Sequence, residues 1–229
     1  MGVTAYSPVP GPGVKVVGSM LRPNAEIIAM LKPDIILVSR EDSAVQFTEQ
    51  LASLGIPVYE FNRNRDFNSL AENYLSLASI LGMDVVAERK VRGYRERLNR
   101  IAGAVSLLKK RPVTAFFLSC APLITASNRS FIGRIIADAG GDNCFGDVDI
   151  AYPKVSLESL IQRRPRVIFM LSGDMVSCLK SDLAAAGMKD TERVRWHVIP
   201  PDHITHYTPA DYAASVEIMA SLIGSGAER

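Results

Sequence analysis

The sequence predicts an α/β fold made of two lobes. Helical and extended segments alternate along the chain, which is typical of βαβ units with parallel sheets. One long amphipathic helix interrupts this alternation near the middle, and one helix–strand unit occurs twice. The 229 residues, 48% of them hydrophobic, suffice for two small cores. We therefore expect two Rossmann-like lobes with parallel sheets, joined by one long α-helix, with the ligand cleft between them at the carboxyl ends of the strands.

The first 83 residues carry the elements of the first lobe. Asn24 is the expected N-cap of a helix that Pro33 ends. The buried face of this helix is expected to comprise Ile27, Ile28, Met30 and Leu31. Turn residues and apolar runs define the other elements. They are strands at 3–7, 14–17, 34–38 and 56–61, and helices at 43–54 and 66–81.

The long helix is expected over residues 84–110. Its apolar residues recur at spacings of four and three, which define one helical face: Tyr94, Leu98, Ile101, Val105 and Leu108. About 27 residues at 1.5 Å each span roughly 40 Å. The remaining faces are rich in Arg and Lys and are expected to face solvent. We interpret this helix as a strut between an N-terminal lobe (1–83) and a C-terminal lobe (111–229).

The second lobe repeats the alternation. The expected strands are 113–119, 166–171 and 194–199, and the expected helices are 130–139, 156–164, 180–186 and 209–223. Pro165 and Gly187 end two of these helices, as their residue types predict.

The same short unit occurs in both lobes. A capping residue, Asn24 or Ser156, is followed two residues later by Glu26 or Glu158. Seven residues after each Glu comes a Pro, and then a β-branched apolar strand. This self-similarity predicts two lobes related by a pseudo-two-fold axis. Each Glu either compensates the dipole of its helix or presents a charge to a partner.

Several classes of function find no support in the sequence. The formal net charge of +2 is close to neutral, so a nucleic-acid surface is not expected. The chain has no nucleophile elbow, Walker sequence or dinucleotide-binding glycine motif, so we do not expect an enzyme. Three cysteines, Cys120, Cys144 and Cys178, without a Cys-x-x-Cys pair favour buried thiols, with one disulfide plus one free thiol as the alternative.

The chain resembles the helical-hinge (class III) substrate-binding proteins of ABC importers, which take up cobalamin, ferric siderophores and haem. The likeness is nearest to the cobalamin-binding members. It rests on an ordered set of segments: Gly2–Ser7 with the prolines after it, Asn24–Asp34, Gln50–Val58, the central helix, Gly140–Asn143 and Tyr152–Glu158.

This resemblance implies a function and partners. The protein would capture a metal chelate (a ferric siderophore, a corrinoid or haem), with no cofactor of its own, and deliver it to an ABC permease dimer at the membrane surface. It would be periplasmic or extracytoplasmic, although no signal peptide or lipid anchor is visible in this chain. Glu26 and Glu158 would dock on the permease, since a symmetric partner requires matching charges.

Aromatic and cationic residues near the strand ends are the candidates for the ligand site. Rings hold planar ligands, and Arg suits an anionic group. The candidates are Tyr6, Met20, Arg22, Tyr152 and Trp196. Packing in a lobe core is the alternative for the rings, Trp196 above all.

Two histidines lie in the loop before the last helix. His203 and His206 are expected on the cleft side, where either could contact the ligand, for example as an axial ligand to a metal centre. A permanent zinc site is not expected, because the sequence offers no further ligands nearby.

The N-terminal lobe departs from the pattern of the family. Family members carry an additional strand and helix ahead of the segment that begins here at Met1, so this lobe is expected to be short. The missing strand would then be supplied by another segment or by a homodimer partner. The same departure is consistent with a cytoplasmic or orphan relative that handles a metallocofactor, or with an inactive truncated binding protein.

Overall fold

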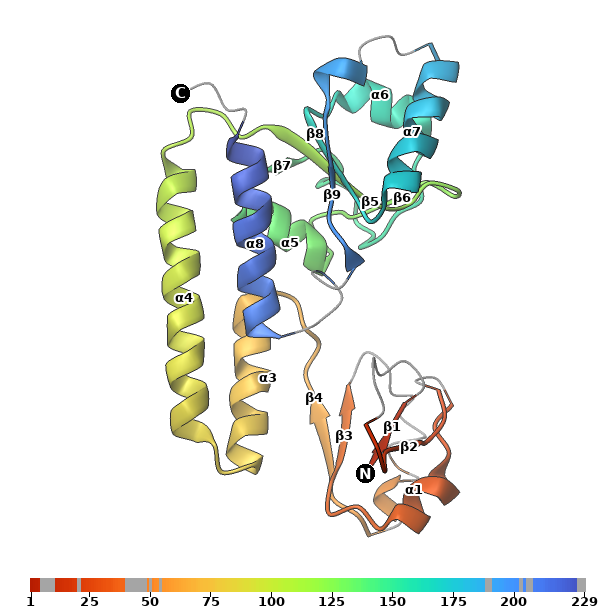
Figure 1. The fold of residues 1–229 in the computed structure, drawn as a ribbon, viewed down its shortest axis with the longest axis vertical. Coiled ribbons are helices and arrows are strands. Elements are labelled where there is room, and N and C mark those ends of the chain that lie inside the picture. Colours follow the sequence, from red (N-terminus) through yellow and green to blue (C-terminus); the bar gives the residue numbers. More distant parts are fainter. Residues whose placement is uncertain are drawn as a thin grey trace. The chain divides into compact units, whose positions relative to one another are not determined.

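A computed structural model describes residues 1–4, 11–19, 22–39, 49, 51–53, 55–187, 191–201, 204 and 208–225. The chain divides into two compact units, Met1–Arg63 (unit 1) and Asn64–Arg229 (unit 2), shown in Figure 1. Both are built from helices and parallel strands, so the predicted α/β fold class is confirmed. No helix among these residues is long and apolar enough to cross a membrane.

Unit 1 contains two short parallel strand pairs and one described helix. Strand β1 (Gly2–Val3) pairs with β2 (Lys15–Val16), and β3 (Ile36–Ser39) pairs with β4 (Val58–Phe61). Helix α1 spans Ala25–Leu31. Its core is small, with Val17, Ile28 and Leu51 buried and a few partly buried apolar neighbours. The predicted helix at 43–54 falls largely outside the described residues.

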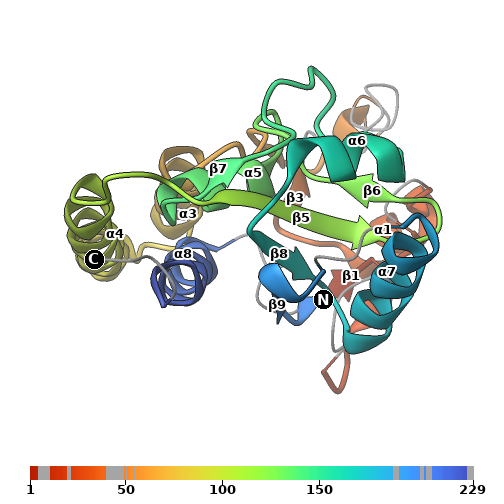
Figure 2. The same ribbon diagram turned by 90° about the horizontal axis from the view of Figure 1, so that it is seen from above.

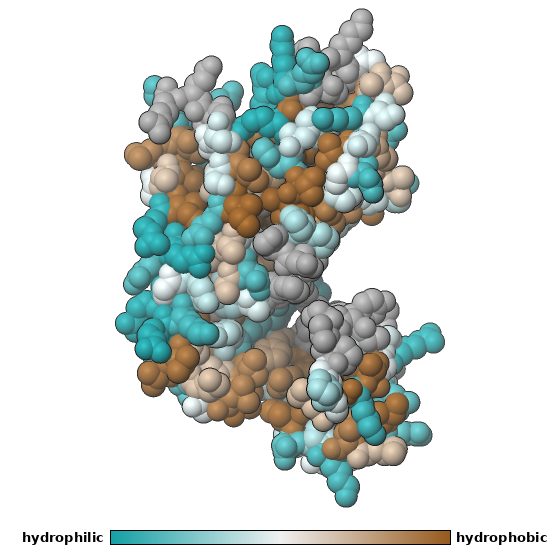
Figure 3. Space-filling model, in the orientation of Figure 1, coloured by the Kyte–Doolittle hydropathy of each residue, from teal (hydrophilic) through white to brown (hydrophobic). Residues whose placement is uncertain are grey.

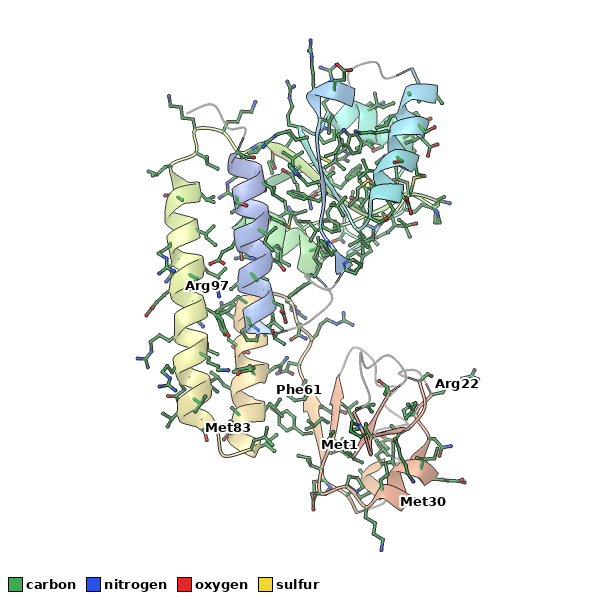
Figure 4. The ribbon with its side chains drawn as sticks, viewed as in Figure 1. Met1, Arg22, Met30, Phe61, Met83 and Arg97 are labelled. Atoms are coloured by element: carbon green, nitrogen blue, oxygen red, sulfur yellow. A yellow bond between two sulfur atoms is a disulfide. The ribbon has the colours of Figure 1, made fainter. Side chains whose placement is uncertain are left out.

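The buried face of α1 is narrower than we expected. Ile28 is buried and Ile27 and Leu31 pack against the same cluster, whereas Met30 is 78% exposed (Figure 4). Residues two apart on a helix lie on nearly opposite sides, so Ile28 and Met30 cannot share one face. The expectation that Met30 is buried was therefore wrong.

Unit 2 is organised around a five-stranded sheet. The central strands β5 (Val113–Ser119), β8 (Val167–Met170) and β9 (Arg195–Val198) are parallel neighbours in that order. Two short strands flank β5: β6 (Ile124–Thr125) is antiparallel to it and β7 (Asp142–Asn143) is parallel to it. The sequence did not reveal β6 or β7, because two-residue strands leave no periodicity to detect.

Both faces of this sheet are buried, and the side chains alternate between them. Phe116 and Phe169 face one core, and Phe117 and Met170 face the other. The first core is covered by α3 (Phe67–Ile80), α4 (Asp84–Ser106), α5 (Phe131–Asp138) and α8 (Pro209–Gly224). The second is covered by α6 (Leu157–Arg163) and α7 (Gly173–Ala185). Continuous apolar strands such as Val113–Ser119 are typical of sheets covered on both sides.

The long helix is part of unit 2 rather than a separate connector. Helix α4 packs along α3 and α8, and Figures 1 and 2 both show these three helices side by side. Its predicted apolar face is used for this packing, since Tyr94, Leu98 and Ile101 contact the first core. We expected the first lobe to end at residue 83; the division instead falls at Arg63, because α3 and α4 both pack against α8.

Charged residues occupy the outer face of α4, as predicted. Figure 3 shows hydrophilic side chains over the middle of this helix. Arg97 is different, because it turns toward α8 and forms two hydrogen bonds to Glu217, of 2.7 and 2.5 Å (Figure 4). This bidentate pair fixes α4 to α8.

One helix begins earlier than the sequence suggested. We expected a helix at 180–186, whereas α7 starts at Gly173. Ser172 caps it by accepting a hydrogen bond from the backbone N–H of Met175. A short 3-10 helix (Thr191–Arg193) then precedes β9.

The cysteines also differ from our expectation of three buried thiols. Cys120 and Cys178 form a disulfide that links the end of β5 to α7, and Cys144 is the free thiol. Three cysteines allow three pairings, and the sequence alone could not choose among them.

Candidate functional site

The carboxyl edge of the sheet in unit 2 is the part of this unit where a ligand is expected. Strands β5, β8 and β9 all end there, at Ser119, Met170 and Val198. Helices α5 and α7 begin at the same edge, each capped by a serine, Ser130 or Ser172. Ligands of parallel α/β sheets bind outside such edges.

Tyr152, a ligand-site candidate from the sequence, lies on the segment that runs beside β6. Its neighbours fix its backbone, because Ala151 accepts a hydrogen bond from the Ser127 N–H (3.0 Å) and Pro153 accepts one from Thr125 (3.1 Å). Tyr152 is therefore held beside β6, and the pairing of β6 with β5 places it level with the middle of β5. Its side chain is 41% exposed, so part of the ring is accessible to a ligand.

An ion pair that sequence reasoning missed lies beside Tyr152. Arg129 contacts Asp149 across 2.8 Å, and both side chains are well exposed. The pair joins the turn before α5 to the segment that leads into Tyr152. Neither residue belongs to a motif. Only their positions in the sequence could have indicated them: Arg129 directly precedes the capping residue Ser130, and Asp149 lies shortly before Tyr152. A pair this exposed contributes little stability, so both charges remain available to a ligand.

Trp196 lies in the middle of β9 and not at the strand end. It packs against the second core, and the Lys180 ammonium lies 5.3 Å from its ring centre. Its ring thus faces α7, in agreement with the packing alternative for this residue. The structure does not bring it together with Tyr152, and its role in ligand binding stays a prediction.

Arg22 is an exposed residue of unit 1. Its backbone N–H donates to the Ser19 hydroxyl (3.1 Å), and Gly18 pairs with Pro23. The turn needs glycine at position 18, where φ is +108° and a Cβ would lie 2.6 Å from the Arg22 carbonyl oxygen. Figure 4 shows the Arg22 side chain at the surface of unit 1. Tyr6, Met20, His203 and His206 lie outside the described residues.

Helices α1 and α6 are near copies of each other. Each has seven residues and a side-chain N-cap, Asn24 in α1 and Ser156 in α6. Each ends at a basic residue with positive φ, Lys32 at 45° and Arg164 at 48°. A proline follows in both cases and disfavours the right-handed helical conformation of the residue before it, so both helices end at the same point.

The repeat places Glu26 and Glu158 at the second position of their helices. Both side chains are exposed. The pKa of Glu158 is lowered by hydrogen bonds from its own backbone N–H and from the Ser156 hydroxyl, so this residue is charged at neutral pH. The structural equivalence of the two glutamates, each within its own unit, is thus confirmed. Their role in docking is not tested by it.

One group of described residues has the composition of a metal site. The ligand atoms of Cys120, Cys178 and Asp182 lie within 4.8 Å of one another. The two cysteines are joined by the disulfide, so the group offers no thiolates in this form.

The fold and the repeated helices define a two-unit α/β binding protein. The chain belongs to the periplasmic binding protein family, whose family model matches residues 3–194. The predicted family is thereby confirmed.

Individual relatives narrow the comparison. The vitamin B12-binding protein of Yersinia pestis (strain Pestoides F) is 29% identical over 171 residues, which are 73% of this chain and 60% of the relative. This chain therefore spans less than two thirds of the relative's length.

Solved structures show the same fold at low identity. The periplasmic vitamin B12 binding protein BtuF of Vibrio cholerae has a TM-score of 0.82 at 21% identity, covering 100% of this chain and 89% of that one. The periplasmic haem-binding protein HutB of Vibrio cholerae has a TM-score of 0.80 at 20% identity, covering 97% and 90%. The periplasmic haem-binding protein BhuT, in complex with two haems, has a TM-score of 0.76 at 19% identity, covering 93% of this chain and 84% of that one.

Proposed function

We propose that this protein is the substrate-binding component of an ABC importer, which captures a metal chelate in the periplasm and delivers it to the permease. The observation that carries this proposal is the family match together with the ligands named for its relatives. Vitamin B12 and haem are both flat macrocycles around a metal ion. A ferric siderophore is the third ligand class that we retain.

The exposed side chains suit a ligand of this kind. In unit 2 the ring of Tyr152 offers an aromatic contact to a macrocycle. In unit 1 the Arg22 guanidinium suits a carboxylate or phosphate group. Tyr6, Met20 and Trp196 are retained as further contacts, and His203 or His206 as an axial ligand of the metal. Binding of this type needs no covalent chemistry and no cofactor of the protein's own.

The Cys120–Cys178 disulfide supports the proposed location. Disulfides form and persist in oxidising compartments such as the periplasm and are rare in the cytosol. This argues against a cytoplasmic relative that handles a metallocofactor. A homodimer stays a prediction.

Ligand titration tests the proposal. Thermal unfolding of the purified chain would be followed with cyanocobalamin, dicyanocobinamide, haem, and hydroxamate and catecholate ferric siderophores. A ligand that binds only the native state raises the free energy of unfolding, by about 2.7 kcal/mol when its concentration is a hundredfold above Kd. The unfolding midpoint rises with it. We expect one class of chelate to produce a saturating shift.

A variant pair links the shift to the site. Tyr152→Ala should weaken binding of that chelate by about fivefold, because it removes an aromatic contact worth roughly 1 kcal/mol. Leu107→Ala also truncates an exposed apolar side chain of unit 2, at the far end of α4, and should leave binding unchanged. If no chelate shifts a cooperatively unfolding sample, the proposal is wrong.

A further inference from the structure

The disulfide of unit 2 lies beside the Asp182 carboxylate, to which it cannot donate a hydrogen bond. Cys120 directly follows β5 at the carboxyl edge of the sheet, and Cys178 lies on α7. Asp182 is four residues further along α7, so its side chain shares a helix face with Cys178. One carboxylate oxygen of Asp182 lies 3.8 Å from the sulfur of Cys120 and 4.0 Å from that of Cys178. A disulfide has no proton to donate, so these approaches are not hydrogen bonds.

The same three side chains have the geometry of a metal site once the sulfur–sulfur bond is broken. Zinc lies about 2.3 Å from thiolate sulfur and about 2.1 Å from carboxylate oxygen, which places sulfur and oxygen about 3.6 Å apart in a tetrahedral site. Both observed sulfur–oxygen distances are within a few tenths of an ångström of this value. Reduction only has to let the two sulfurs separate to non-bonded contact.

We propose that Cys120, Cys178 and Asp182 form a redox-gated site for a thiophilic divalent cation such as Zn²⁺. The disulfide form is closed to the metal, and reduction opens the site. A dithiol reductant supplies two electrons and two protons to the Cys120–Cys178 bond, yielding two thiols while the reductant closes to its own disulfide. Metal binding then releases the two thiol protons to solvent.

The surroundings of the three residues favour this use. Both cysteines are half-buried, and Cys120 packs against the second core of unit 2. Cys178 is carried by a helix and Cys120 directly follows a sheet strand, so regular elements hold both in place. Asp182 is exposed, so the fourth coordination position would be open to water or to another ligand. Two thiolates and one carboxylate favour zinc or cadmium over magnesium or calcium.

The redox conditions of the compartment would decide whether the site can bind metal. In a reducing compartment the thiols persist and can hold the metal, whereas in an oxidising compartment the disulfide excludes it. This inference does not depend on which chelate the protein captures, because its ligands are different residues from Tyr152 and Arg22.

Zinc titration in the two redox states tests the proposal. The full chain would be reduced with a water-soluble trialkylphosphine, which takes up the oxygen of one water to become a phosphine oxide as the disulfide becomes two thiols. After anaerobic removal of the phosphine, Zn²⁺ would be titrated against a chromophoric chelator. We expect the reduced protein to bind one equivalent at least about a hundredfold more tightly than the oxidised protein. Substitution with Co²⁺ should produce a thiolate-to-metal charge-transfer band.

Variants identify the ligands. Asp182→Asn keeps the disulfide and should weaken zinc binding by the reduced protein about tenfold or more, because one anionic ligand is lost. Asp174→Asn changes an exposed carboxylate in the first turn of the same helix and should have no effect. Cys144→Ser should also have no effect, because burial raises the pKa of that thiol to about 12.

Three results would overturn the proposal. The first is equal zinc affinity in the oxidised and reduced proteins. The second is zinc binding that persists in the Cys120→Ser, Cys178→Ser double variant, which would place the site elsewhere. The third is an Asp182→Asn protein that binds zinc as tightly as Asp174→Asn, since the carboxylate would then not be a ligand.

Discussion

The position of His197 makes the stability of the fold depend on pH. It lies on β9 with its ring 5.5 Å from that of Phe169, on the face of the sheet covered by α8. Its Nε2 atom is buried and has no hydrogen-bond partner in the described structure. Its neighbour Arg195 donates to the carbonyl oxygens of Leu222 and Ile223 at the end of α8, so a positive charge is fixed close by.

These surroundings predict that acid destabilises the fold through His197. Burial, and to a lesser extent the charge of Arg195, lower the pKa of His197 in the folded state. The unfolded chain then binds the proton more readily, so stability is complete above the unfolded pKa of about 6.5 and falls as the pH drops below it. His197→Phe removes both the proton site and the unpaired nitrogen. We expect it to gain about 1 kcal/mol at neutral pH and to lose less stability on acidification than the natural protein.

Chemical denaturation of the two proteins between pH 7 and pH 5 measures this difference, where pH 5 is about 1.5 units below the unfolded pKa. The other two histidines are present in both proteins, so the comparison isolates His197. Parallel stability curves for His197→Phe and the natural protein would contradict the prediction.

At the scale of elements, α5 is positioned by the absence of one side chain. A Cβ on Gly133 would lie 1.9 Å from the carbonyl oxygen of Ser127, so the helix can approach this turn only with glycine there. The turn also carries Arg129, and Ser127 donates to the segment of Tyr152. The close approach thus determines the position of the candidate site.

Gly133→Ala should therefore destabilise the protein by about 1–3 kcal/mol or more, because the backbone must move to remove the overlap. Gly93→Ala is the matched control, since a Cβ at this position of α4 meets nothing within 4 Å. This second change should stabilise by about 0.5–1 kcal/mol through helix propensity alone. Urea unfolding of both variants gives the comparison, and equal effects of the two substitutions would refute the close-packing argument.

The elements that could be predicted from the sequence are those determined by residues close together in the chain. Spacing predicted α4 to within a few residues and the buried strand β5 to the residue, and capping residues with prolines predicted α1 and α6. What could not be predicted depends on contacts distant in the chain. The backbone of Tyr152 is fixed by residues 125 and 127, and Cys120 meets a partner 58 residues away. The division at Arg63 depends on the packing of α3 and α4 against α8, which periodicity does not encode.

At the scale of the whole molecule, the duplicated helix is the feature that bears on delivery to a permease. Unit 1 presents Glu26 and unit 2 presents Glu158, at the same position of two helices with matching caps at both ends. A single charge would be explained by the dipole of its own helix. The recurrence of the same exposed charge, with the same local geometry, in both units is instead what a partner with two equivalent subunits would require.

Charge reversal therefore distinguishes docking from capping. If the proposed function holds, Glu26→Lys and Glu158→Lys should each weaken binding to the permease by at least about tenfold, because like charges facing each other across an interface cost several kcal/mol. The double variant should be weaker than either, and all three should bind the chelate as the natural protein does. Asp174→Lys reverses an exposed charge in the first turn of α7 and should dock normally. Binding to the permease in nanodiscs, measured at low and at moderate salt, gives the result. Docking that is unchanged in the double variant would show that the two glutamates serve only their own helices, whereas a loss seen equally in Asp174→Lys would indicate a general effect of net charge.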